Sequence, residues 1–141
     1  MFIRFSCYIA SMEKIVLLKS LLLLFPAVIF LQSGLDKVFK LDENKTYIHA
    51  VFARTFLKPL SDMMFYMLLV IELLIGALAI AGIFLLVFQS QATVGYYTFL
   101  LSAVTLTFLL AGQRIARDYV GAAGLVPYLI VAFFGLYLFS I

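Results

Sequence analysis

Glu72 is the one charged residue inside the apolar stretch "LLVIELLIGALAIAG", Leu68 to Gly82. An unpaired charge at the centre of a bilayer costs about 2.5–3.5 kcal/mol on insertion scales, so such a carboxylate normally loses its charge or meets a donor. We therefore expect Glu72 to act either as a structural clamp between helices or as a carboxylate that handles a proton or a ligand. A lipid-facing accident is the third alternative.

Four residues near the ends of neighbouring apolar segments carry groups that could partner Glu72. They are Gln32, Lys37, Gln113 and Arg114. Gln32 is nearest to Glu72 in expected depth, whereas Lys37 or Arg114 would have to fold inward or act through water. Together with Glu72, these residues form the predicted intramembrane polar cluster.

A second concentration of charge lies in "AGQRIARDYVGAAG", residues 111–124. On a helical continuation Arg114 and Asp118 would be i, i+4 neighbours. Arg117 and Asp118 are predicted to form an interfacial charged turn. A guanidinium there would bind an anionic headgroup, a partner's acid or a quinone carbonyl, or would simply anchor the turn at the cytoplasmic surface.

The elements that position these residues follow from composition. Of the 141 residues, 66% are hydrophobic and 12% are charged, whereas soluble domains are roughly 45–50% apolar and about 25% charged. A membrane-spanning helix needs about 20 mainly apolar residues, and four segments qualify: 15–35, 63–88, 92–112 and 121–141. Because lipid offers no partner for backbone groups, we expect these spans to be α-helices.

The expected fold class is therefore all-α, an antiparallel bundle of four transmembrane helices in a single membrane domain, residues 1–141. Gly34 is expected to cap the first helix, and Pro26 to bend it. The loop 36–62 is expected to hold a short amphipathic helix, about Tyr47 to Leu57, on the bilayer surface. Residues 1–14 are expected at the surface, and Met12 is an alternative start to Met1.

Small residues predict where helices pack closely. One set follows Glu72 in the second helix: Gly76, Ala77, Ala79, Ala81 and Gly82. The other set lies at i, i+4 and i+8 of the third helix: Ala103, Thr107 and Ala111. Glu72 is expected to share the packing face of the first set.

Single copies of cysteine and histidine exclude several kinds of site. With Cys7 alone the chain has no internal disulfide or CxxC pair. With His49 alone it offers no bis-histidine haem ligation or multi-histidine metal site. We therefore expect no metal and no intrinsic cofactor, and a quinone is the one cofactor left open.

Charge distribution predicts how the bundle sits in the membrane. Alternating helices place seven Lys and Arg residues on the side of the loop 36–62 and three on the side of both termini. Because cytoplasmic loops carry an excess of Lys and Arg, the first side is expected to be cytoplasmic. The expected location is the bacterial cytoplasmic membrane, as a multi-pass protein.

Three motifs together resemble the DoxX family of small bacterial membrane proteins. They are "FLQSGLDKVFK" at the end of the first helix, "IELLIGALAIAG" in the second, and "GQRIARDYVGAAGLVPYLI" entering the fourth. The resemblance spans about residues 15–141. The family's features map onto Ser33, Gly34, Lys37, Glu72 and Gly76, and less firmly onto Arg114 and Arg117.

The resemblance implies a four-helix bundle in a bacterial cytoplasmic membrane. Some members are subunits of thiosulfate:quinone oxidoreductases, and others resemble membrane partners of redox or export assemblies. We expect an accessory or scaffolding subunit that contacts membrane lipid and either a partner membrane protein or further copies of itself, with no nucleic acid. A quinone-interacting oxidoreductase subunit is the alternative, and a transporter or channel subunit is the weaker one. The sequence does not establish that the protein is an enzyme.

Overall fold

The computed structural model describes the backbone from Phe2 to Ile141 and the side chains from Glu13 onward. Glu13 and Lys14 are exposed. The rest of the expected surface segment, with Cys7 and the alternative start at Met12, lies outside the described side chains.

Helices make up almost all of the described backbone, which contains no strand. They are α1 (Phe2–Phe39), α2 (Leu41–Phe52), the 3-10 turn η1 (Lys58–Leu60), α3 (Ser61–Gln89), α4 (Thr93–Ile115) and α5 (Tyr119–Ser140). Residues 13–39 of α1, η1 with α3, α4 and α5 are each long and apolar enough to cross a membrane. The all-α class and the short helix after the first span are confirmed.

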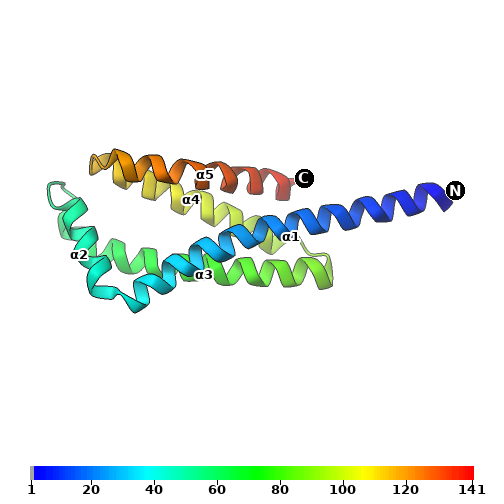
Figure 1. Ribbon diagram of the computed structural model, residues 1–141, viewed down its shortest axis with the longest axis horizontal. Coiled ribbons are helices and arrows are strands. Elements are labelled where there is room, and N and C mark those ends of the chain that lie inside the picture. Colours follow the sequence, from blue (N-terminus) through cyan, green and yellow to red (C-terminus); the bar gives the residue numbers. More distant parts are fainter. Residues whose placement is uncertain (1) are drawn as a thin grey trace.

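Two pairs of helices make up the bundle (Figure 1). The most extensive contacts join α1 to α3 and α4 to α5, and α3 to α4 contacts link the two pairs. The α3–α4 connection lies at the same end as the last turn of α5, whereas α2 and the α4–α5 turn lie at the opposite end (Figure 1). We call this second end the α2 end. It holds the loops that carry most of the charge.

Gly34 does not end the first helix, so the expectation of a cap at this position is wrong. The helix continues to Phe39 and breaks at Lys40, whose backbone has φ −124° and ψ 50°. Gly34 is not among residues with positive φ, which the usual glycine cap requires. Its missing side chain instead makes room for α3, as described below.

The loop helix begins and ends earlier than the expected span of Tyr47 to Leu57. Asp42 and Glu43 lie in the first turn of α2, where acidic side chains favour the positive end of a helix. Phe52 ends the helix as a buried residue, and its ring faces Gly112 of α4. Because of this contact, α2 docks on the bundle through its last turn.

The packing face of α3 is confirmed where Gly76, Ala79 and Gly82 are buried together with Glu72. Ala77 and Ala81 of the same set are not buried on it.

The expected stripe on α4 is wrong. Of its three residues only Ala103 is buried, and the buried small and polar residues of α4 are Gly95, Thr98, Ser102, Ala103, Thr105 and Gly112. A strict four-residue spacing advances by more than one turn of about 3.6 residues, so it rotates away from a fixed contact face.

Two hydrophobic clusters fill the bundle along its length. One consists of Phe30, Ile75, Ala103, Leu106 and Ala132. The other consists of Leu23, Leu86, Phe99 and Phe139, nearer the α3–α4 connection. Each cluster draws from all four long helices, so the long helices pack as one unit.

Candidate functional site

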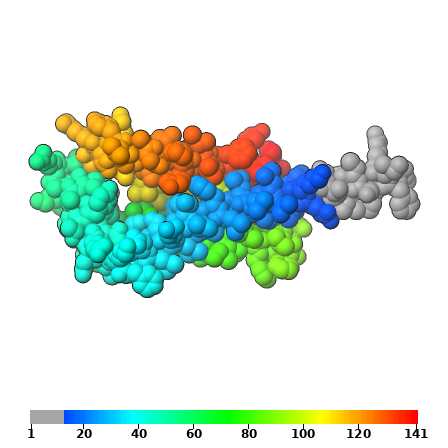
Figure 2. Space-filling view, in the orientation of Figure 1, coloured from blue at the N-terminus to red at the C-terminus, as the bar shows by residue number. Residues whose placement is uncertain are grey.

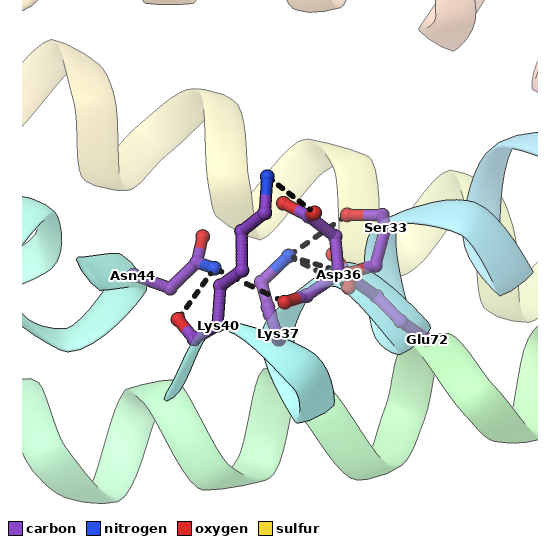
Figure 3. Close-up of polar contacts among 6 residues, drawn as sticks. All are labelled: Ser33, Asp36, Lys37, Lys40, Asn44 and Glu72. Atoms are coloured by element: carbon purple, nitrogen blue, oxygen red, sulfur yellow. Dashed lines mark hydrogen bonds and ion pairs between the residues drawn. The ribbon is translucent and has the colours of Figure 1, made fainter. Parts of the chain in front are cut away.

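Glu72 lies on the buried face of α3, and its carboxylate faces α1 (Figure 3). Lys37 Nζ donates to Glu72 Oε2 at 2.8 Å. The two side chains are 12% and 4% exposed, respectively. Each charge therefore has an opposite charge in contact, which is the condition for burying either of them.

Ser33 holds the ammonium of Lys37 in place. The lysine Nζ also donates to Ser33 Oγ at 2.8 Å, one helical turn back on α1. Ser33 and Lys37 share one face of α1 because residues four apart lie above one another on a helix. This second bond satisfies a further N–H donor of the ammonium. It holds the ammonium on the side of α1 that faces Glu72 of α3 (Figure 3).

Two glycines let α1 and α3 approach closely beside the ion pair. A Cβ added to Gly34 would lie 2.7 Å from Leu73 Cδ2 and 3.3 Å from the Leu73 backbone nitrogen. A Cβ added to Gly76 would lie 2.6 Å from Leu31 Cδ2 and 3.1 Å from the Leu31 backbone nitrogen. Each helix thus places a leucine against the other's glycine. We call these two contacts the glycine notches.

A polar corner follows the ion pair where α1 turns into α2. Lys40 pairs with Asp36 at 3.3 Å on the exposed side of α1. Asn44 Nδ2 donates to the carbonyl oxygens of Lys40 at 2.9 Å and Asp36 at 3.3 Å (Figure 3). The same two carbonyls also accept from backbone nitrogens, Asp36 O from Lys40 N at 2.8 Å and Lys40 O from Asn44 N at 3.0 Å, so the Asn44 side chain adds to the backbone bonds across the corner between α1 and α2.

Of the four predicted donors, the structure brings only Lys37 to Glu72. Gln32 is exposed, since it lies about 100° around the helix from Ser33. Arg114 is exposed as well, and its guanidinium carbon lies 4.8 Å from the centre of the Tyr119 ring. Gln113 is half-buried, and its Oε1 has no hydrogen-bond partner among the described residues.

The predicted interfacial turn divides between two helices. Since α4 ends at Ile115, Asp118 does not continue its face, and the expected i, i+4 relation with Arg114 is wrong. Asp118 is instead the N-cap of α5, and its Oδ1 accepts from the Gly121 backbone nitrogen at 3.0 Å. Arg117 precedes it in the left-handed region at φ 61°.

A second polar contact, which the sequence analysis did not predict, joins α2 to α3. Asp62 Oδ1 accepts from Lys45 Nζ at 3.1 Å and lies 3.0 Å from His49 Nε2. The Lys45 ammonium also lies 5.2 Å from the centre of the Tyr66 ring. The sequence feature that could have predicted this contact is the i, i+4 spacing of Lys45 and His49, which places both residues on one face of a helix. We call this group the α2 clasp.

Glu72 and Lys37 pair their charges within the protein. Among the described residues, no three His, Cys, Asp or Glu side chains gather as a metal site. Lys37 and Glu72 form a buried ion pair. Removing one partner of such a pair typically lowers the free energy of unfolding by about 3–5 kcal/mol, because the other charge stays buried without a partner.

No protein-family model, curated protein or solved structure matches this chain. The DoxX resemblance therefore stays a prediction, and functional inference depends on the geometry of the site.

Proposed function

We propose that this chain is a DoxX-like multi-pass protein of the bacterial cytoplasmic membrane that serves as an accessory or scaffolding subunit of a membrane complex. The observation that carries the proposal is the contact between Lys37 and Glu72 at 2.8 Å. Because each charge satisfies the other inside the bundle, the pair is suited to holding α1 against α3.

The positions of the motif residues support the DoxX-like assignment. Ser33, Gly34 and Lys37 come from one motif of the resemblance, and Glu72 and Gly76 come from another. All of them meet at the α1–α3 contact, as the ion pair and the glycine notches. A shared structural task explains why these residue types occur at these spacings.

The outer surface supports a role in assembly. Large apolar side chains are exposed along each of the long helices, among them Leu21, Val70, Phe108 and Phe134. Lipid or a partner membrane protein covers such a surface in a bilayer. With the α2 end facing the cytoplasm, the excess of Lys and Arg there agrees with the usual charge asymmetry.

The experiment is purification of the full chain from its native membrane in a mild detergent, with mass spectrometry of the proteins and lipids that accompany it. We expect partner membrane proteins, or further copies of the chain, to co-purify. A solitary chain that carries a bound quinone would overturn the proposal in favour of a quinone-interacting subunit.

A double variant, Lys37→Met with Glu72→Leu, separates structural from chemical use of the pair. Replacing a buried ion pair by apolar side chains of similar volume is often neutral or stabilising. We therefore expect this variant to fold and to keep its partners. If it folds and assembles but abolishes quinone-dependent electron transfer by the complex, the pair has a chemical role and the scaffolding proposal is wrong.

A further inference from the structure

Exposed cations gather on two loops at the α2 end of the molecule. One loop, between α2 and η1, contributes Arg54, and η1 itself contributes Lys58; the end of α4 and the turn after it contribute Arg114 and Arg117. We call these four residues the cationic rim. Figure 2 shows that the α2 segment and the start of α5 lie at the same end of the molecule.

A packing contact holds the two parts of the cationic rim near each other. The ring of Phe52 reaches Gly112, where a Cβ would lie 3.4 Å from Phe52 Cζ. Arg54 follows Phe52 by two positions, and Arg114 follows Gly112 by two. The two parts of the rim therefore lie at the same end of the molecule, on segments far apart in the sequence (Figure 2).

Two acidic side chains at the α2 end have their charges paired within the protein. Asp36 pairs with Lys40, and Asp62 pairs with Lys45 and His49. Asp118 accepts the backbone bond that caps α5 but keeps its negative charge. Asp42 and Glu43 are exposed in the first turn of α2, at the other end of that helix from Arg54. Within the part of the chain whose side chains are described, Arg54, Lys58 and Arg117 form no ion pair, so the four cations of the rim outnumber Asp118, the acid that adjoins them.

Aromatic side chains flank these cations. Phe56 lies between Arg54 and Lys58 and is 74% exposed. Tyr119 is 56% exposed, and its ring faces the Arg114 guanidinium. Aromatic rings next to basic residues at the end of a membrane helix suit the boundary between headgroups and acyl chains, and a guanidinium suits bidentate contact with phosphate.

From this juxtaposition we propose that the cationic rim binds the headgroups of anionic phospholipids in the adjacent leaflet. The apolar helices place the rim at headgroup depth, and the surplus charge selects phosphate groups that carry a net negative charge. Each cation at such a surface contributes roughly a fivefold gain in affinity for anionic lipid.

The test titrates the full chain in detergent micelles with dioleoyl phosphatidylglycerol or with dioleoyl phosphatidylcholine. Thermal stabilisation gives the apparent affinity, and native mass spectrometry counts the retained lipid. Arg54→Gln combined with Arg117→Gln removes one charge from each part of the rim, and we expect it to weaken phosphatidylglycerol binding about 25-fold. Lys14→Gln combined with Lys40→Gln is the matched control, since it removes the same charge from a distant site and from an internally paired lysine.

We expect the control to change the affinity less than about threefold. Equal weakening by both double variants, or equal binding of the two lipids by the unmodified chain, would overturn the proposal. Raising the salt concentration from about 0.05 M to about 0.5 M should weaken phosphatidylglycerol binding by the unmodified chain, and the absence of a salt effect would also overturn it. An acidic protein that co-purifies with the chain, displaces phosphatidylglycerol and is lost in the rim variant would assign the surface to a protein partner instead.

Discussion

Lys37 Nζ and Glu72 Oε2 lie 2.8 Å apart across the α1–α3 contact, although 35 positions separate the two residues in the chain. The glycine notches lie at the same α1–α3 contact, with Gly34 on the helix that carries Lys37 and Gly76 on the helix that carries Glu72. Geometry and charge thus act together at one point of the bundle.

Gly76→Ala tests the close approach of the helices. The new Cβ would lie 2.6 Å from Leu31 Cδ2 and 3.1 Å from the Leu31 backbone nitrogen, so α1 and α3 must separate. We expect a loss of about 1–3 kcal/mol in the free energy of unfolding. The measurement is reversible unfolding in mixed micelles, by circular dichroism.

Gly124→Ala is the control for this substitution. No atom lies within 4 Å of a Cβ at Gly124 on α5. Alanine there should stabilise the helix by about 0.5–1 kcal/mol, because glycine loses more conformational freedom on folding. Equal effects of the two substitutions would show that Gly76 does not mark a close contact.

Arg117→Gly is expected to stabilise the protein. The backbone at Arg117 has φ 61°, and its nitrogen bonds to the Arg114 carbonyl while the Asp118 nitrogen bonds to the Gln113 carbonyl. This is the helix-ending motif in which glycine is usual, and a side chain in the left-handed region costs about 1–2 kcal/mol. We expect a gain of about 1 kcal/mol in thermal unfolding experiments.

Arg117→Ala distinguishes backbone strain from loss of charge. It removes the same guanidinium but keeps a Cβ at the strained position, so no comparable gain is expected. If Arg117→Ala stabilises the protein as much as Arg117→Gly does, the gain comes from relief of charge repulsion.

The α2 clasp predicts a dependence of stability on alkaline pH. The hydrogen bond to Asp62 raises the pKa of Lys45 above the ordinary lysine value of 10.5. A raised lysine pKa stabilises the folded state below the unfolded pKa, and this contribution is lost as the pH rises through the folded pKa. The difference in melting temperature between the unmodified chain and Asp62→Asn should therefore narrow above about pH 10.5. A difference that stays constant from pH 8 to beyond this range would contradict the role of Lys45, leaving only the His49 contact.

Hydropathy alone predicts the long helices, because long apolar runs in lipid admit few other structures. The expected spans 63–88, 92–112 and 121–141 correspond to α3, α4 and α5 with small differences at their ends. The end of the first helix was missed, since a glycine followed by lysines is typical both of a helix cap and of a close helix contact. Only the opposing Leu73 distinguishes the two, and it lies on another helix.

The same error affected the candidate site. Because the expected first helix ends before Lys37, the sequence predicts that Lys37 reaches Glu72 only by folding inward or through water. In the structure α1 carries Lys37 directly onto the face that contacts α3. Gln32 is the predicted donor nearest to Glu72 in membrane depth, but depth does not determine which side of a helix a residue occupies. The α2 clasp and the Phe52–Gly112 contact join distant segments, so one sequence without the fold does not reveal them.

A double-mutant cycle on Lys37→Met and Glu72→Leu, followed by unfolding in mixed micelles, tests most directly whether the ion pair holds α1 to α3. Each single variant leaves one charge buried without a partner and should lose about 3–5 kcal/mol, whereas the double variant should be about as stable as the unmodified chain. The predicted coupling free energy is therefore about 6–10 kcal/mol, the sum of the two single losses. Additive losses in the double variant, or single variants as stable as the unmodified chain, would contradict the account.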